Sequence, residues 1–421
     1  MRLLILAGAG TSIELGVPAM EGMAIEFIAH SEQWNVEPEL VRQMMGNVLD
    51  VECLIENLDR ICAAREPLKT IGNSAAPLDR VDTVRSEVEW FVQHAAERIA
   101  ARDAHLMWGS VLRTAKDHEL TFVTTNYDRA IELAANTEHV SLIDGFESFG
   151  ETEVAPWTGF DSTNNNPSIV KLHGSTDWYA DLGSDQPLKL RHPMPLFGRG
   201  TLRLSNGEEL GSALVLPSRE KLLTRPPYPR LSQAFLNAAD ACEAAIFVGS
   251  SLRDPHIRDA ASTIATDRPV FIINPGGDSL GIDHAKPIAQ PASQFLISTL
   301  PTALSHPDPR TILADISDIP QKRNTSILGL LRLATDENEQ TERRCEAIEQ
   351  LDQQSVNIDE HLIRKLLSSA DGTVARYTLG LLATSPGREA ILAVALQSPH
   401  ADDKYFAEEL TLLKRMINDK K

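Results

Sequence analysis

The sequence predicts an α/β protein built on a Rossmann-like parallel sheet, with a helical insertion and an all-helical C-terminal module. Six short apolar runs recur through the first 300 residues, and four of them end in small polar residues. This is typical of buried parallel strands whose carboxyl ends carry a site. Helical periodicity fills the long interval after the first run and returns beyond residue 300. We therefore expect a sheet-containing domain at 1–300 and a helical domain at 301–421.

Six runs are the expected strands: 3–10, 120–128, 168–175, 213–218, 244–251 and 269–277. The first, "LLILAGAG", leads directly into Gly8-Ala9-Gly10 and then into helix-like sequence. Such a turn can present backbone N–H groups to a phosphate, although its spacing differs from the dinucleotide fingerprint G-x-G-x-x-G. Taken alone, the turn is equally compatible with a ligand loop and with a bare strand-to-helix connection.

The long interval between the first two strands predicts a helical insertion at about 20–115. Apolar residues there recur at helical spacing, for example from Val51 to Leu58. Two later stretches, 145–167 and 179–210, are rich in Gly, Pro, Asn and Asp. We expect irregular loops or hairpins in these stretches, lying beside the site.

The tail after residue 300 is helical in pattern and contains two similar units. Residues 330–351 and 362–383 share a layout of apolar helix, polar turn, Arg-containing start and second apolar helix. The layout is compatible with short helical repeats of the HEAT type. We expect this module to serve assembly or contact with a partner; an extra helical bundle with no partner is the alternative.

Composition limits the classes of partner and the cellular setting. With 40 Lys+Arg against 59 Asp+Glu, the formal charge of −19 argues against broad binding to nucleic acid or to anionic membrane. The four cysteines are scattered and form no C-x-x-C pair, so the sequence predicts neither a disulfide framework nor a zinc site. No apolar stretch reaches membrane-spanning length. We expect a cytoplasmic protein.

Small polar side chains follow the expected strands. "TTNYD" carries Asn126 and Asp128, and "KLHGS" carries His173. The later strands lead to Gly249, Ser250, Ser251 and Asn274. Each has an ordinary structural explanation, because a lone histidine is often a hydrogen-bonded structural residue and Ser-Ser or Asn-Pro often makes a turn. For Asp254 in "DPH" we expect a helix cap or a turn, and no catalytic role.

The order of these motifs along residues 1 to about 300 resembles the sirtuin family, specifically the bacterial sirtuin-like, NAD-consuming branch found in antiphage defence. The resemblance implies that the glycine turn holds the diphosphate of NAD⁺. It implies that Gly8, Ala9, Gly10 and Ser12 line the diphosphate loop, that Asn126 and Asp128 flank the nicotinamide and its ribose, and that His173 is the catalytic histidine. It further implies that Gly249, Ser250 and Ser251 lie against the phosphate and the adenosine ribose, and that Asn274 contacts the hydroxyls of that ribose.

Two departures from the deacylating sirtuins bear on the reaction. Those enzymes carry Asp-Phe-Arg where this sequence has Ala19-Met20-Glu21, and they carry a four-cysteine zinc module. Peptide deacylation is therefore disfavoured, and we expect an NAD⁺ hydrolase that releases nicotinamide and ADP-ribose, with NAD⁺ as substrate and no other cofactor. The alternatives are an NAD-dependent deacylase or ADP-ribosyltransferase, which needs an acceptor groove, and a non-catalytic NAD or ADP-ribose sensor.

Cleavage of the nicotinamide–ribose bond has oxocarbenium character, as glycoside hydrolysis does. We expect Asn126 to position water or the ribose, and His173 to accept a proton from a ribose hydroxyl or from water. The resemblance also implies an antiphage effector that depletes NAD⁺ when triggered, forms a homo-oligomer and, in some systems, works with a hexameric HerA-type ATPase. This chain has no G-x-x-x-x-G-K-[ST] motif of its own.

Overall fold

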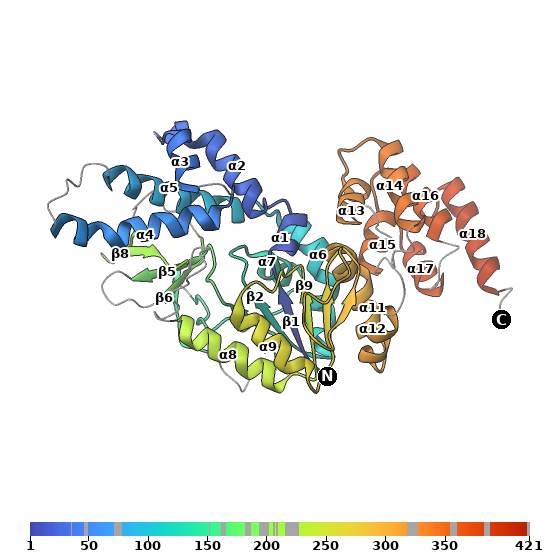
Figure 1. The fold of residues 1–421 in the computed structure, drawn as a ribbon. Coiled ribbons are helices and arrows are strands. Elements are labelled where there is room, and N and C mark those ends of the chain that lie inside the picture. The colour runs from blue at the N-terminus through green and yellow to red at the C-terminus, as the bar shows by residue number, and fades with distance from the viewer. Residues whose placement is uncertain are drawn as a thin grey trace.

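Six parallel strands form the central sheet of the computed structural model, in the order β11-β10-β9-β1-β2-β4 (Figure 1). They are β1 (Arg2–Ala7), β2 (Glu119–Thr124), β4 (Ser168–Lys171), β9 (Ala244–Val248), β10 (Val270–Ile273) and β11 (Lys286–Ile288). The structure describes residues 1–34, 36–45, 49–70, 78–150, 152–160, 166–181, 187–192, 202–204, 207, 209–214, 227–317, 327–353, 360–382 and 388–418.

The predicted α/β fold with a parallel sheet is confirmed. Five of the six expected strands contain a strand of this sheet, and β11 was not expected. In the sixth expected run, 213–218, the two described residues are not in a strand, and 215–218 lie outside the described residues.

Alternate residues of β1 point to opposite faces of the sheet, and each face has its own apolar core. Leu4 and Leu6 pack in the core that contains α8 (Tyr228–Ala241) and α9 (Pro255–Ala265). Leu3 and Ile5 pack in the larger core on the other face, which contains α6 (Ala101–Arg113) and α7 (Ala130–Thr137). Burial on both faces explains why the strands read as nearly continuous apolar runs.

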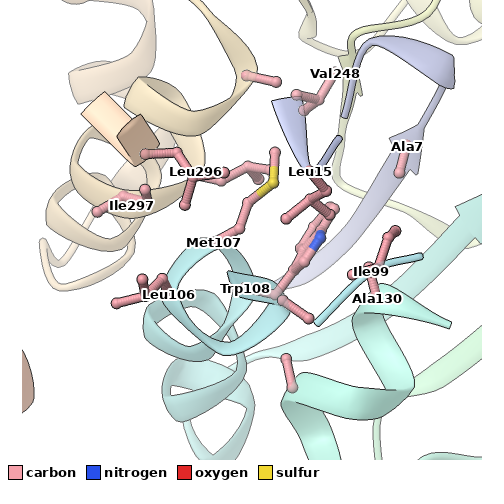
Figure 2. Close-up of a cluster of buried hydrophobic side chains, with 14 of the residues drawn as sticks. Ala7, Leu15, Ile99, Leu106, Met107, Trp108, Ala130, Val248, Leu296 and Ile297 are labelled. Atoms are coloured by element: carbon pink, nitrogen blue, oxygen red, sulfur yellow. The ribbon is translucent and has the colours of Figure 1, made fainter. Parts of the chain in front are cut away.

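Helix α6 is largely buried in the larger core (Figure 2). Leu106, Met107 and Trp108 of this helix are buried, and Figure 2 shows Met107 lying toward both Leu15 and Leu296. Trp108 meets Phe122 of β2 edge-to-face, with ring centroids 6.0 Å apart. Through these contacts α6 joins the sheet to the helical turn at Phe295–Thr299, which follows the last strand.

The interval between β1 and β2 is helical, which confirms the predicted insertion. It contains α1 (Ala9–Glu14), α2 (Met20–His30), α3 (Pro38–Met45), α4 (Val51–Thr70), α5 (Leu78–Ala96) and α6 (Ala101–Arg113), with 3₁₀ turns at Ser31–Trp34 and Thr114–Lys116. An ion pair of 2.7 Å between Arg98 and Glu26 joins the segment after α5 to α2. In Figure 1 the blue helices α2 to α5 form a group at one end of the molecule.

A second sheet occupies much of the region expected to be loops or hairpins. It is antiparallel, in the order β3-β6-β5-β8-β7, and its strands are β3 (Val154–Pro156), β5 (Trp178–Asp181), β6 (Pro187–Leu190), β7 (Leu202–Arg203) and β8 (Glu209–Ser212). Trp157 and Trp178 pack with Phe146 beside this sheet. Within the expected loops, residues 151, 161–165, 182–186, 193–201, 205–206 and 208 lie outside the described residues.

After β11 all the described secondary structure is helical. The segments are α10 (Ala292–Gln294), a π-helical turn (Phe295–Thr299), α11 (Leu300–Leu304), α12 (Pro309–Ser317), α13 (Ile327–Thr335), α14 (Thr341–Gln353), α15 (Glu360–Leu367), α16 (Gly372–Leu382), α17 (Arg388–Ala395) and α18 (Lys404–Asn418). The predicted all-α C-terminal module is thus present. Helices α13, α15 and α17 pack in succession, as do α14, α16 and α18, while the HEAT assignment stays a prediction.

The C-terminal helices are tied to the sheet-bearing part of the chain. Arg102 of α6 donates to Thr335 Oγ1 at 2.6 Å, and Arg332 pairs with Asp103 at 3.0 Å. Leu300 is fully buried in the larger core. The predicted domain boundary at residue 300 stays a prediction and falls inside a continuous helical run. None of the described helices is long and apolar enough to cross a membrane.

Candidate active site at the carboxyl ends of the strands

The glycine turn after β1 packs directly on the turn after β9. Gly8 N donates to Val248 O at 2.9 Å, and Gly10 N donates to Gly249 O at 2.8 Å. A Cβ placed on Gly10 would lie 2.7 Å from Gly249 Cα, which is closer than real side chains approach. The two turns are therefore in backbone contact, and glycine is required for it.

We expect Gly10→Ala to lower the free energy of unfolding by about 2–3 kcal/mol, because the added methyl group must push two backbones apart. Urea unfolding followed by circular dichroism measures this. The matched control is Gly380→Ala in α16, where the nearest atom to a new Cβ is 3.7 Å away. Since alanine favours a helix, the control should gain up to about 1 kcal/mol. Equal unfolding midpoints for Gly10→Ala and the wild type would contradict the described contact.

Most backbone amides of the turn after β1 already have a hydrogen-bond acceptor. Gly8, Gly10 and Thr11 each donate their backbone N–H to a carbonyl, and within the described structure only the Ala9 amide of this turn lacks such a bond. The turn is therefore organised first by its own packing. That its amides hold a diphosphate stays a prediction.

Asn126 lies against this turn. Its Nδ2 donates to Gly8 O at 2.9 Å and to Thr11 Oγ1 at 3.0 Å. Its backbone N–H donates to Thr124 Oγ1, and that hydroxyl donates to Ala7 O. A predicted catalytic residue after β2 is thus joined to the predicted diphosphate loop after β1.

Asp128 and Ser12 form a second link between the same two segments. Ser12 Oγ donates to Asp128 Oδ2 at 2.5 Å, and Asp128 Oδ1 accepts from Ala130 N at the start of α7. Both side chains are buried. Asp128 therefore has a clear structural role in this structure, and its predicted role at the nicotinamide ribose is untested.

His173 follows β4 and is only 5% exposed. Its Nδ1 lies 3.2 Å from Thr125 O, the carbonyl just before Asn126. A carbonyl only accepts, so Nδ1 carries a proton. Its Nε2 lies 3.7 Å from Asp254 Oδ2. The structure thus brings both predicted catalytic residues to one edge of the sheet.

Lys171 is a buried residue of this region that sequence reasoning missed. It is 1% exposed, and its Nζ donates to the Asp128 backbone carbonyl and, at 2.9 Å, to Glu132 Oε1. Burial raises the pKa of the Glu132 carboxyl, with Lys171 acting in the opposite direction. The available signal was a single lysine inside the apolar strand of "SIVKLHGS". A buried lysine in such a strand must have a partner.

The remaining predicted residues lie at the same ends of the strands but make local contacts. Ser250 Oγ accepts from Leu252 N, and Ser251 is exposed. Asn274 Nδ2 donates to Asp278 O at 2.9 Å, while its Oδ1 accepts from Gly277 N. These bonds are those of turn-making residues. The predicted roles at the adenosine ribose are untested.

A cavity of about 490 Å³ lies between α8 and α9 and reaches His173. Its walls include apolar side chains such as Phe235 and Ile257, and its polar groups include Asp254 and Asp259. His173 therefore faces the segment of Asn126 through Nδ1 and this cavity through its other side.

Metal ligands do not gather in the described part of the chain. All four cysteines are free thiols, and among the described residues no group of three His, Cys, Asp or Glu side chains could hold a metal ion.

Solved structures of Sir2 proteins are similar to the chain at low identity. A Sir2 homologue in complex with NAD shares 15% identity over 74% of this chain and 90% of that chain, with a TM-score of 0.40. A mutant Sir2 homologue in complex with 2′-O-acetyl-ADP-ribose shares 14% identity over 76% and 94%, with a TM-score of 0.40. A Sir2 complex with a p53 peptide and NAD⁺ shares 14% over 70% and 90%, with a TM-score of 0.34.

No curated protein matches the chain. Residues 120–280 match the family model described as a SIR2-like domain. The matched stretch contains Asn126, His173 and Asp254, whereas the glycine turn of β1 lies before it. The resemblance expected from the order of the motifs is thus confirmed for this stretch: residues 120–280 are similar to a SIR2-like domain.

Proposed function

We propose that the protein is an NAD⁺ hydrolase that cleaves the nicotinamide–ribose bond to give nicotinamide and ADP-ribose. The observation that carries the proposal is that hydrogen bonds join the segments that follow four strands, β1, β2, β4 and β9. Asn126 bonds to Gly8, Gly10 bonds to Gly249, and the carbonyl of Thr125 holds His173. An amide and a histidine beside a glycine turn, in a chain with a SIR2-like stretch, suit NAD⁺ chemistry.

In the proposed reaction, the bond between C1′ of the ribose and the nicotinamide nitrogen breaks, and its electron pair leaves with the nicotinamide. Asn126 positions the ribose or the attacking water. His173 takes a proton from water or from a ribose hydroxyl, with Nε2 as the accepting nitrogen because Nδ1 is protonated. The balance is NAD⁺ and water to nicotinamide, ADP-ribose and one proton.

One observation favours the second candidate, a transferase or deacylase that moves a group to or from an acceptor. Such an enzyme needs an acceptor groove, and the α8–α9 cavity reaches His173. An acceptor that enters there would meet the histidine on the side away from Thr125. The hydrolase remains our proposal because in hydrolysis the acceptor is water, which needs no groove to bind.

The experiment that separates these functions is incubation of the full-length protein with NAD⁺, with and without an acetylated lysine peptide. Release of nicotinamide without peptide supports the hydrolase. Release that requires the peptide supports the deacylase, and attachment of ADP-ribose to a protein supports the transferase. Tight binding of NAD⁺ with no turnover would support a non-catalytic sensor and would overturn the enzyme proposal.

The biological setting that we propose is antiphage defence by depletion of NAD⁺, in a cytoplasmic homo-oligomer that works with a hexameric HerA-type ATPase. A hydrolase that was always active would drain the NAD⁺ of its own cell, so low activity alone and higher activity with a trigger or partner are expected. Light scattering of the full-length protein tests assembly, and a monomer at micromolar concentration would contradict it. NAD⁺ turnover that such an ATPase and phage triggers leave unchanged would contradict the regulation.

A further inference from the structure

We propose that Asp254 is a positioning residue for His173 and that the negative charge of its carboxylate stabilises the imidazolium form of the ring. The inference rests on the proposed function, because it concerns the histidine of that reaction. Asp254 Oδ2 lies 3.7 Å from His173 Nε2, and the two side chains are 18% and 6% exposed. The sequence suggested for Asp254 only a cap or a turn.

The helix cap explains why the carboxylate is oriented toward the histidine. Asp254 is the N-cap of α9, and its Oδ1 accepts from His256 N at 3.0 Å. This bond restricts the rotation of the side chain, because the oxygen must stay on the first turn of the helix. The second oxygen, Oδ2, is the one near His173. One carboxylate therefore serves the helix and the histidine together.

The distance of 3.7 Å suits a supporting role. It exceeds hydrogen-bond length, so the carboxylate does not bond to Nε2, yet it lies within ion-pair range. With Nδ1 protonated against Thr125 O, Nε2 is the nitrogen that gains a proton. A nearby negative charge favours that protonated form. The O–H bond of water or ribose breaks, the N–H bond forms, and the proton stays on His173 rather than moving to Asp254.

The other described titratable groups near the ring are a lysine directed elsewhere, two neutral phenols and side chains of the cavity wall. Lys171 is the last residue of β4, the strand that precedes His173, and its Nζ donates to Asp128 O and Glu132 Oε1. Burial raises the pKa of Tyr127 and of Tyr228, so both phenols are neutral at neutral pH. The further titratable side chains that line the cavity are His256, Asp259 and Asp240. Asp254 lies at ion-pair distance from the ring.

The test uses Asp254→Asn and Asp254→Ser in the full-length protein. Asparagine and serine are both good N-caps, so α9 keeps its cap while the charge is lost. We expect kcat for nicotinamide release to fall at least about 10-fold in both variants, with little change in KM or in melting temperature. Asp259→Asn, which removes another cavity carboxylate, should match the wild type. Wild-type kcat in Asp254→Asn, or a loss that only follows the folded fraction, would overturn the proposal.

A measurement that does not depend on turnover of NAD⁺ tests this proposal separately from the proposed function. In protein with ¹⁵N-labelled histidine, the His173 ring signals are assigned by their loss in His173→Gln and followed against pH. Asp254→Asn should move the protonation midpoint of His173 to lower pH by about one pH unit, and Asp259→Asn should not. If that shift appears while the wild type leaves NAD⁺ intact, only the proposed function fails. If the midpoint does not move, the role of Asp254 is wrong.

Discussion

Asn126→Ala should reduce nicotinamide release about 100-fold or more, because a misplaced reactant loses that much rate. The side chain bridges Gly8 O and Thr11 Oγ1, so its removal frees the turn after β1 from the segment after β2. Gly8 O also accepts from Thr11 N, so it keeps a donor. The free energy of unfolding should therefore fall by only about 1 kcal/mol. Steady-state assays and urea unfolding on the same preparation measure both effects.

The matched control for this variant is Asn136→Ala. Asn136 lies on α7 and is exposed, so its loss should change neither turnover nor stability. Turnover of Asn126→Ala near the wild-type rate would show that "TTNYD" does not serve the reacting ribose. A loss of stability like that of a large core substitution would instead assign Asn126 to the fold alone.

Lys171→Met should lower the free energy of unfolding by about 3–5 kcal/mol, because it leaves the largely buried Glu132 carboxylate without its partner. Lys171 Nζ lies 2.9 Å from Glu132 Oε1 and also holds the Asp128 carbonyl. Turnover should fall as well, since that carbonyl belongs to the segment of Asn126. The comparison is Arg343→Met, which breaks an exposed pair with Glu339 and should cost less than about 1 kcal/mol.

The stability defect of Lys171→Met should depend on pH. Burial already raises the pKa of Glu132, and loss of the opposing ammonium raises it further. A carboxyl with a raised folded-state pKa favours the fold below its ordinary pKa and loses that contribution as pH rises through the folded value. The defect should therefore be small near pH 4 and largest at neutral pH. The double variant Lys171→Met, Glu132→Leu should recover most of the stability, and an equal defect at both pH values would contradict this account.

The parallel sheet, and the meeting of the candidate site residues at one of its edges, were predictable from the sequence for a physical reason. Strands buried on both faces, such as β1 and β9, are apolar throughout and end at the residues that carry polar groups. Carboxyl ends of parallel strands share one edge, so Asn126, His173 and the glycine turn were expected to lie together.

Contacts across long stretches of sequence were not predictable in the same way. Lys171 and Glu132 are 39 residues apart, and only the fold brings their side chains together. The contact of Asp254 with His173 depends on the direction of α9 relative to β4. Short strands such as β3 and β7 are too brief to give a periodic pattern, so the antiparallel sheet appeared in the sequence only as loops or hairpins.

The most direct test of the central claim is chromatographic analysis of NAD⁺ incubated with the full-length wild type, Asn126→Ala and His173→Ala, without peptide or protein acceptor. We predict that the wild type produces nicotinamide and ADP-ribose in equal amounts, slowly if a trigger is absent, and that neither variant does. NAD⁺ that stays intact with the wild type on prolonged incubation, or products that both variants form as fast as the wild type, would contradict the claim that this site hydrolyses NAD⁺.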